Sequence, residues 1–323
     1  MSRLLKIGTR DSALALWQAR KVQEELKQHG YPSELVPVKS TGDLILDKPL
    51  YELGITGIFT KTLDVALLAG QIDLAVHSLK DVPTALPKGI IQAAVLPRGT
   101  IEDVLVRKNT PGNQRHGVVA TGSLRRKAQW LRKYPGDRIE NLRGNVQTRL
   151  QKLEDSAWDG AIFAAAGLER LEIKPEHLEV LDWMLPAPAQ GALMVAVRED
   201  APQVFEQVRN LNHLPSELCV GIERYFLRGL EGGCTAPIGA LARIKKNEIL
   251  FTGGVFSLDG RDVSTIEERS LIPEDILTGV GPLEEYSQQV QAYAKILGEQ
   301  YARTTLEAGG AAIMETLRNA LDQ

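Results

Sequence analysis

The stretch LLKIGTRDSALALWQARKVQEELKQ, residues 4–28, decides the fold class. It begins with an apolar run over residues 4–8 and continues through a polar Asp11-Ser12 pair. Apolar residues then recur at helical spacing over residues 13–28. This is a strand followed by a capped amphipathic helix, the first half of a βαβ unit. The unit is completed by a strand-like pattern at 34–38, a helical pattern at 61–69 and a buried-strand pattern at 72–76. Together these patterns predict an α/β lobe with a parallel sheet.

The same alternation starts again after Arg98-Gly99-Thr100. The pattern predicts strands at 104–106, 118–120, 139–142 and 160–164 and helices at 123–134 and 146–153. The proline-rich and glycine-containing stretch LPAPAQG, residues 185–191, indicates a stiff connection between lobes. The next strand, 193–197, is expected to return to the first lobe. Two α/β lobes joined by such crossings leave a cleft between them.

The last third has a different pattern. Residues 216–230 form an amphipathic helix, with Ser216 as the expected cap. Strand-like runs follow at 238–243, 248–256 and 262–269, with turns at Lys246-Asn247 and Asp259-Gly260, and a long helical stretch closes the chain. The prediction is a small α+β domain with a three-stranded antiparallel sheet.

Composition limits the possible partners. The 323 residues carry 38 basic and 41 acidic side chains, a net charge of −3. This balance gives no overall attraction to nucleic acid or to an anionic membrane, so any basic site must be local. The N-terminus lacks a signal-peptide pattern, and no apolar stretch approaches the roughly 20 residues of a spanning helix. With Cys219 and Cys234 as the two cysteines, we expect a cytoplasmic protein without a disulfide framework.

Four polar clusters follow predicted strands, where ligands of α/β folds gather. Gly8-Thr9-Arg10-Asp11-Ser12 is either an anion site or simple helix capping with a solvated arginine. In His77-Ser78-Leu79-Lys80-Asp81-Val82-Pro83, the Lys–Asp pair is either a surface ion pair or a carboxylate held for acid–base work.

The other two clusters are rich in arginine. Each of them opens a helix. One is Thr121-Gly122-Ser123-Leu124-Arg125-Arg126-Lys127, and the other is the stretch from Asn141 to Leu150, which contains Arg143 and Arg149. Basic side chains at a helix N-terminus oppose the helix dipole, so a plain charged surface explains them less well than a ligand does. Arginine binds carboxylate or phosphate in bidentate fashion, which predicts a small, strongly anionic ligand.

Cys234 stands in Glu231-Gly232-Gly233-Cys234, a glycine-rich loop after a helix. A thiol in such a loop is either a nucleophile or an attachment point. Cys219, inside an amphipathic helix, is expected to lie in the core. The sequence shows no metal-binding motif and no nucleotide-binding glycine loop, so no metal is expected.

These motifs, in this order and together with Pro188-Ala189-Gln190-Gly191, resemble the hydroxymethylbilane synthase (porphobilinogen deaminase) family across essentially the whole chain. The resemblance implies two lobes like those of type II periplasmic binding proteins plus a small C-terminal α+β domain. The implied boundaries are 1–97 with 192–212 for domain 1, 98–191 for domain 2 and 213–323 for domain 3. It also implies a monomer.

The implied activity is a transferase of tetrapyrrole (haem) biosynthesis. It would join four porphobilinogens head to tail on a dipyrromethane cofactor held by a thioether to Cys234, and release hydroxymethylbilane. Asp81 matches the catalytic aspartate. Positions that match cofactor- or substrate-binding residues are Arg10, Ser12, Ser78, Lys80, Thr121, Ser123, Arg125, Arg126, Arg143, Gly144, Arg149, Arg170 and Gln190.

The chain departs from the family pattern in two loops and one turn. The loop Ile55-Thr56-Gly57-Ile58-Phe59 lacks the lysine of typical members, Ser40-Thr41-Gly42-Asp43 replaces Thr-Arg-Gly-Asp, and Gly122 replaces a frequent serine. Two other functions are compatible with part of the sequence. A non-enzymatic two-lobe anion-binding protein explains the arginines but gives Cys234 no role. A cysteine hydrolase needs a histidine base and an oxyanion hole, for which the sequence shows no family signature.

Overall fold

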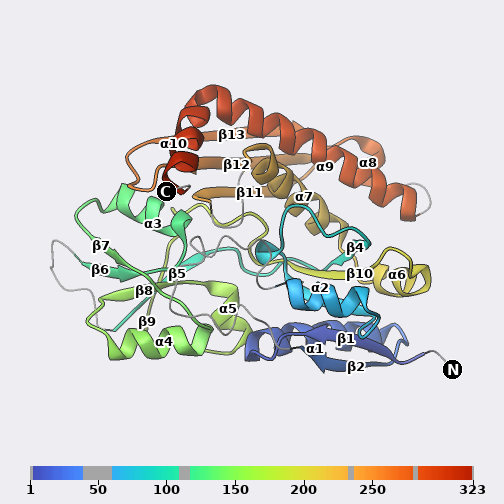
Figure 1. The fold of residues 1–323 in the computed structure, drawn as a ribbon. Helices are drawn as coiled ribbons and strands as arrows, with labels where there is room; N and C mark the ends of the chain where they lie inside the picture. Colours follow the sequence, from blue (N-terminus) through green and yellow to red (C-terminus); the bar gives the residue numbers. More distant parts are fainter. Residues whose placement is uncertain (1–2, 39–59, 109–116, 232–235, 279–282, 322–323) are drawn as a thin grey trace.

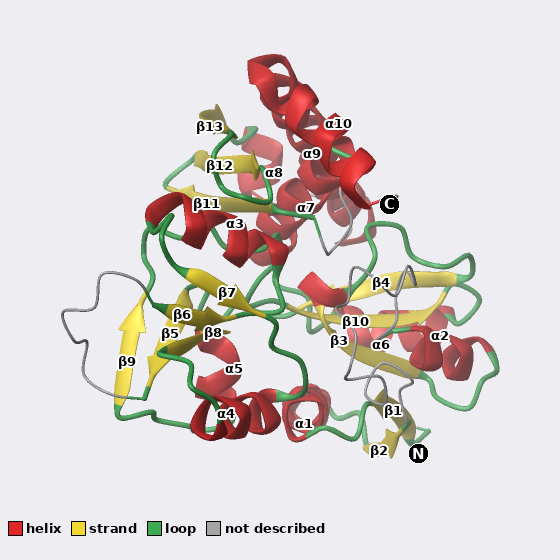
Figure 2. Ribbon diagram, turned by 60° about the vertical axis from the view of Figure 1, so that its left-hand side comes forward, coloured by secondary structure: helices red, strands yellow, loops and turns green. Residues whose placement is uncertain are grey.

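The computed structural model describes residues 3–38, 60–108, 117–231, 236–278 and 283–321 (Figure 1). Two α/β lobes lie side by side, and a third unit, built from a sheet and helices, lies over both of them (Figure 2). The predicted loops at 40–43 and 55–59, and Cys234, lie outside the described residues.

Lobe 1 is a five-stranded sheet with the order β2-β1-β3-β10-β4. Its strands are β1 (Leu5–Thr9), β2 (Ser33–Pro37), β3 (Leu74–Ser78), β4 (Ile90–Val95) and β10 (Leu193–Arg198). Helices α1 (Ala13–Gln28) and α6 (Pro202–Arg209) contribute to the core on one face, and α2 (Lys61–Leu68) contributes to the core on the other. Ser12 caps α1 as predicted, because its hydroxyl accepts a hydrogen bond from the Ala15 amide at 3.3 Å.

Lobe 2 repeats the arrangement with the order β7-β6-β8-β5-β9. Its strands are β5 (Asp103–Arg107), β6 (Val118–Ala120), β7 (Arg138–Glu140), β8 (Gly160–Ala164) and β9 (His177–Val180). Helix α3 (Leu124–Lys133) packs on one face, and α4 (Val146–Asp155) and α5 (Ala165–Arg170) pack on the other.

Each sheet is mixed rather than fully parallel, which corrects the prediction. Strand β10 returns from lobe 2 to lobe 1, as expected, and pairs antiparallel with both β3 and β4. Strand β5 enters lobe 2 from lobe 1 and pairs antiparallel with β8 and β9. A strand that crosses between lobes enters from the opposite side, so its direction is reversed. Sequence patterns missed β4 and β9.

The third unit has an antiparallel sheet of β11 (Ile238–Lys245), β12 (Glu248–Phe256) and β13 (Val263–Leu271). Helices α7 (Leu214–Gly229), α8 (Glu274–Thr278), α9 (Leu283–Thr305) and α10 (Ala311–Leu321) complete it, and α7, α9 and α10 form its core against the sheet. Both predicted turns, at Lys246-Asn247 and Asp259-Gly260, lie between the strands as expected. The predicted fold class is therefore confirmed.

Two details of the third unit differ from expectation. Helix α7 begins at Leu214, and its cap is His213, whose ring accepts from the Ser216 amide, so the expected Ser216 cap is wrong. Proline at the second helical position lets the helix start earlier than Ser216. The closing helix is divided near Gly309, whose φ of +101° cannot continue a helix.

Candidate active site

The Lys80–Asp81 turn lies at the end of β3, close to where the chain crosses between lobes. It is a single 3-10 turn, η3 (Leu79–Asp81). Leu79 and Val82 are buried on either side, and the Leu79 amide donates to the Ala192 carbonyl at 3.0 Å. Lys80 and Asp81 stand between these anchors and are half-buried. Packing on both sides therefore fixes where the two charged side chains begin.

Opposite this turn, α3 presents its two predicted arginines in its first turn. Both pair with Asp103, which is fully buried at the start of β5. Arg126 Nη2 lies 2.7 Å from Asp103 Oδ1, and Arg125 Nη1 lies 2.7 Å from Oδ2. Burial raises the pKa of Asp103, but the two guanidiniums outweigh it and hold that pKa well below its ordinary value. Asp103 is thus a permanent anion under the two arginines.

Gln190 links the turn of lobe 1 to this ion pair of lobe 2. Its Oε1 accepts from Lys80 Nζ at 3.2 Å, and its Nε2 donates to Asp103 Oδ1 at 3.0 Å. Burial, with a smaller contribution from the Arg126 guanidinium, lowers the pKa of Lys80 to about 8, against the raising effect of Asp81. The predicted residues Lys80, Arg125, Arg126 and Gln190 therefore form one contiguous cluster.

Arg143 and Arg149 add positive charge from the start of α4. Arg149 Nε donates to the Gly144 carbonyl at 2.7 Å. Burial and, to a smaller extent, the charge of Arg126 lower the pKa of Arg149 to about 10, against the raising effect of Asp81. Arg149 therefore interacts electrostatically with groups of both lobes. Arg143 is buried, and burial lowers its pKa as well.

Gly144 allows this corner to form. Its φ of +117° lies in the region that favours glycine, and a Cβ would approach Thr148 Cγ2 to 2.7 Å. Gly122, which replaces the serine of many family members, is also crowded, because a Cβ there would lie 2.5 Å from the Leu142 carbonyl oxygen. The backbone of this corner is thus adapted to glycine at both positions.

The predicted hydroxyl residues make local contacts. Thr121 Oγ1 accepts from the Ser123 amide at 3.2 Å, and Ser123 Oγ accepts from the Arg126 amide at 3.4 Å. Ser78 Oγ accepts from Gln18 Nε2 at 2.8 Å. These contacts, like the Ser12 cap, order the strand ends, and the ligand-binding role of the four hydroxyls stays a prediction.

Arg10 interacts with His77 at the neighbouring strand end. Burial and, to a smaller extent, the charge of Arg10 lower the pKa of His77 to about 4. The imidazole is therefore neutral at pH 7, which agrees with a structural role.

Arg170 lies apart from the cluster, where the two lobes meet. Its Nη2 donates to the Gly191 carbonyl at 2.6 Å, and its guanidinium carbon lies 5.6 Å from the centre of the Trp17 ring. The structure thus gives Arg170 a contact between α5, α1 and the crossing segment. Its substrate-side role stays a prediction.

Sequence reasoning missed Asp103 and a second buried pair, Arg98–Glu223. Arg98 Nη1 lies 2.6 Å from Glu223 Oε1, and its Nε donates to the Gln190 carbonyl at 2.8 Å. The available signal was in each case a charged residue next to or within an apolar stretch. Asp103 stands at the start of β5, and Glu223 lies on the buried face of α7. Cys219 is buried as predicted, and burial raises its pKa to about 12, which makes it a poor nucleophile.

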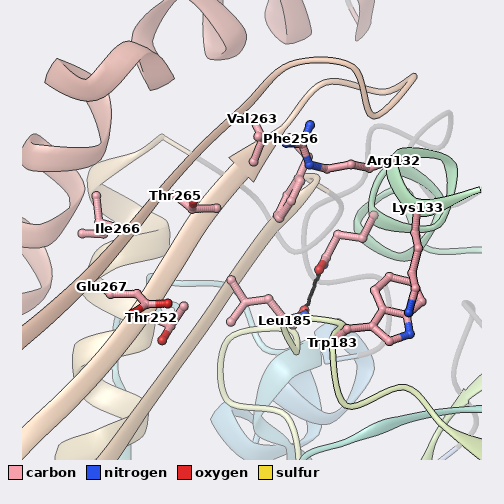
Figure 3. Close-up of a pocket in the computed structure, with 11 residues that line it drawn as sticks. Arg132, Lys133, Trp183, Leu185, Thr252, Phe256, Val263, Thr265, Ile266 and Glu267 are labelled. Carbon is pink, nitrogen blue, oxygen red and sulfur yellow. Dashed lines mark hydrogen bonds between the residues drawn. The ribbon is translucent and has the colours of Figure 1, made fainter.

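A cavity of about 560 Å³ lies elsewhere, between lobe 2 and the third unit (Figure 3). Trp183 and Leu185 line it on one side and Thr252, Phe256 and Val263 on the other. None of the predicted site residues lines this cavity. In the described ranges no group of three or more acidic, histidine or cysteine side chains could hold a metal ion, and no described helix could span a membrane.

Comparison with known proteins identifies the family. A family model described as porphobilinogen deaminase, dipyromethane cofactor binding domain, matches residues 5–206, and one described as porphobilinogen deaminase, C-terminal domain, matches residues 217–280. A porphobilinogen deaminase of Desulfitobacterium hafniense is 42% identical over 328 residues, covering 99% of both chains. The chloroplastic porphobilinogen deaminase of Oryza sativa subsp. japonica is 43% identical over 290 residues, covering 86% of this chain and 81% of its own.

Among solved structures, the chain is similar to the BvgS periplasmic VFT2 domain of Bordetella pertussis, with a TM-score of 0.41 and 11% identity over 64% of this chain and 86% of that one. It is also similar to an ancestral cationic amino acid solute binding protein, with a TM-score of 0.41 and 15% identity over 64% and 87% of the two chains. The assignment rests on the sequence matches, which span both lobes and the third unit. The chain belongs to the porphobilinogen deaminase family.

Proposed function

We propose that this protein is a hydroxymethylbilane synthase, which joins four porphobilinogens head to tail and releases the linear tetrapyrrole. One observation carries the proposal beyond family membership. Five cationic side chains from both lobes, Lys80, Arg125, Arg126, Arg143 and Arg149, gather around two carboxylates, Asp81 and Asp103. Porphobilinogen carries an acetate and a propionate on its pyrrole, so a chain of such units needs this excess of positive charge.

The cluster fits the carboxylates of a dipyrromethane cofactor. Arg125 is nearly fully buried, and its Nε has no hydrogen-bond partner within the described part of the chain. Burial and neighbouring cations lower the pKa of Arg149, with only Asp81 opposing them, so the site favours a further anion beside it. A bound carboxylate would satisfy both deficits through charge-assisted hydrogen bonds.

When bound, the dipyrromethane supplies the terminal pyrrole α-carbon to which porphobilinogen is added. We assign its attachment to the sulfur of Cys234, on the residue types around that position. Arg125, Arg126, Arg143, Arg149 and Lys80 hold carboxylates, and Gln190 keeps Lys80 in place. We assign lesser binding roles to Arg10, Ser12, Ser78, Thr121, Ser123, Gly144 and Arg170.

We assign the catalytic role to Asp81. In each addition the aminomethyl C–N bond of porphobilinogen breaks, ammonia leaves with its electron pair, and a cationic azafulvene-like electrophile remains. A C–C bond then forms between the methylene carbon of this electrophile and the α-carbon of the terminal pyrrole. A proton leaves the same α-carbon. The Asp81 carboxylate accepts hydrogen bonds from pyrrole N–H groups, stabilises the positive charge as it develops, and assists the loss of the proton. Water releases the finished tetrapyrrole.

The remaining assignments also belong to the proposal. The chain comprises three folding units, 1–97 with 192–212, 98–191 and 213–323, and works as a cytoplasmic monomer. The three separate sheets support this division. A two-lobe anion-binding protein would also use the arginines, but neither the third unit nor a thioether-forming cysteine would have a role in it.

The experiment that tests the proposal is the intact mass of the denatured protein beside that of a Cys234→Ser variant. We expect the wild-type protein to exceed its sequence mass by two porphobilinogens less two ammonias, and the variant to lack this excess. Porphobilinogen should add the same mass to unmodified wild-type protein and should release ammonia on turnover. If unmodified protein gained no mass and released no ammonia, the enzyme proposal would fail and the anion-binding function would replace it.

A further inference from the structure

One side chain of the third unit holds the turn that carries Lys80 and Asp81. Arg224, on α7, donates from Nη1 to the carbonyl oxygens of Leu79 at 3.2 Å and Val82 at 2.9 Å. Its Nη2 donates to the carbonyl oxygen of Pro83 at 2.6 Å. One guanidinium therefore spans the turn from its first residue to the segment just after it.

These carbonyls lie in a short helix, at its cap and just beyond it, where the helix itself supplies few donors. The Val82 amide donates to the Leu79 carbonyl at 3.2 Å, and the last carbonyls of a helix have no intrahelical partner. A guanidinium presents its donors in a rigid planar fork and can fix several acceptors at once. A lysine ammonium is a point charge on a flexible stem, so it cannot reproduce this set of bonds.

The position of the turn determines the position of the Asp81 carboxylate. Asp81 lies between Lys80 and the buried Val82, and Arg224 binds the main chain on both sides of this pair. A small rotation of the turn would move Asp81 relative to Arg149, with which it interacts electrostatically. Displacement of a catalytic group by about 1 Å can lower a rate by about 100-fold.

The same helix leads toward the predicted attachment point. Helix α7 ends at Gly229, and Cys234 follows five residues later in the sequence. The neighbouring residue on α7, Glu223, binds Arg98 and the Ala189 amide, which lie on the two crossings between the lobes. Helix α7 therefore contacts the catalytic turn and both crossings, and the chain continues from it to the cysteine.

We propose that Arg224 is a positioning residue, through which the third unit sets the placement of the Asp81 carboxylate; the inference rests on the proposed function. Arg224 acts on the chemical step through the main chain of residues 79–83. Its removal should therefore lower the rate of turnover while leaving the binding of porphobilinogen carboxylates to the arginines of lobe 2 intact.

The test compares Arg224→Met, Arg224→Lys and Arg224→Gln with wild-type enzyme, with rates expressed per mole of protein carrying the primer mass. We expect Arg224→Met to lower kcat by about 10- to 100-fold with KM changed less than about threefold. Lysine and glutamine should restore only part of the rate, since each makes fewer of the three bonds. Arg228→Met is the matched control, because Arg228 lies exposed in the last turn of α7; it should leave kcat within twofold.

A double variant separates positioning from general stabilisation. If Arg224 acts through Asp81, Arg224→Met should lower the residual rate of an Asp81→Asn enzyme by less than about threefold, because the placed carboxylate is already gone. A purely structural role predicts that the two losses multiply.

Each outcome decides the inference. Multiplying losses, an Arg224→Met rate within twofold of wild type, or a loss confined to KM would overturn it. Failure of all three Arg224 variants to fold would also overturn it in favour of a structural role. Wild-type protein that releases no ammonia from porphobilinogen would instead refute the proposed function, which is measured first and separately.

Discussion

The two buried ion-pair clusters of this protein differ in how completely they are satisfied. Glu223 accepts four hydrogen bonds, two from Arg98, one from the Ala189 amide and one from the Ala242 amide. One carboxylate there meets one guanidinium. Asp103 faces two guanidiniums, those of Arg125 and Arg126, and further cations stand beside them.

The difference separates a structural pair from the proposed binding site. The Arg98–Glu223 cluster is charge-balanced and joins α7, β11 and both crossings, so it has nothing left to offer a ligand. The Asp103 cluster has excess positive charge and a buried donor, Arg125 Nε, without a partner in the described ranges. Burying charge without compensation is costly, and a protein retains such a cost where a ligand removes it.

The largest effect on stability should come from breaking the balanced cluster. Glu223→Gln leaves the Arg98 guanidinium buried without a counterion, and we expect the free energy of unfolding to fall by about 3–5 kcal/mol. Urea unfolding of the two proteins measures this. Glu299→Gln is the control, because its pair with Lys295 is half-exposed at 4.0 Å and should matter by less than about 1 kcal/mol. A Glu223→Gln loss no larger than that of the control would contradict the comparison.

The largest effect on activity should come from Asp81. Asp81→Asn keeps the size of the side chain but removes its charge, and we expect kcat to fall by about 100- to 1000-fold with an unchanged melting temperature. Steady-state release of ammonia and a thermal melt check the two parts. Asp182→Asn, at an exposed position, should have neither effect. A fully active Asp81→Asn enzyme would exclude Asp81 as the catalytic group.

Replacing Arg149, one of the surplus cations, should weaken substrate binding without lowering the stability of the protein. Arg149→Met is expected to lower kcat/KM for porphobilinogen by about 10-fold or more, the contribution of one charge-assisted hydrogen bond. In the Cys234→Ser background, which would lack the cofactor, the melting temperature should stay the same or rise, because a partly uncompensated buried charge is removed. The exposed Arg243, changed to Met, is the control. A clear fall in melting temperature would assign Arg149 to the structure instead.

A smaller effect should follow the charge of Lys80. Its folded-state pKa is lowered from 10.5 to about 8. KM for porphobilinogen should therefore rise severalfold as the pH rises through about 8, because the ammonium loses its proton. Between pH 8 and 10.5 Lys80 binds more protons in the unfolded chain than in the folded protein. The free energy of unfolding should therefore rise with pH over this range. Lys80→Met should remove both dependences, and an unchanged KM profile would exclude Lys80 from binding.

The smallest effect is expected for alkylation of Cys219, which lies beside the Arg98–Glu223 cluster. The Cys219 thiol lies near Arg98 and Glu223, and burial raises its pKa to about 12. Iodoacetamide at pH 8 should leave Cys219 unmodified in the folded protein and modify it after unfolding in urea, as peptide masses would show. Rapid labelling of the folded protein would mean that this region opens.

Local patterns were enough to predict most of the fold. Ser12 caps its helix as expected, and strand β8 occupies the predicted residues 160–164. The errors concern elements whose direction or limits depend on distant partners. The antiparallel course of β10 follows from the crossing between lobes, and the start of α7 depends on His213, whose amide donates to the Val95 carbonyl in β4.

The sequence predicted a set of site residues but not the hydrogen bonds and ion pairs that join them. Arg125, Arg126, Arg143 and Arg149 stood out because charged residues at helix starts need a reason, whereas the role of Asp81 was implied by the family resemblance. Asp103 did not stand out, because one aspartate before an apolar strand is an ordinary feature of sequences. Arg224 likewise sits among the charged residues of an amphipathic helix, where no spacing shows that its target is a main-chain turn.

The sequence by itself determined most of the succession of strands and helices, the cap of α1, and which charged groups stand at strand ends. These depend on side chains within a few positions of one another. Only the tertiary structure decided which charges are compensated, because the partners are far apart: Gln190 lies 87 residues from Asp103 and 110 from Lys80, and Arg224 lies 141 residues from Pro83. Packing of the lobes and the third unit brings these groups together, and burial there gives their charges the strength to bind a ligand or hold a turn.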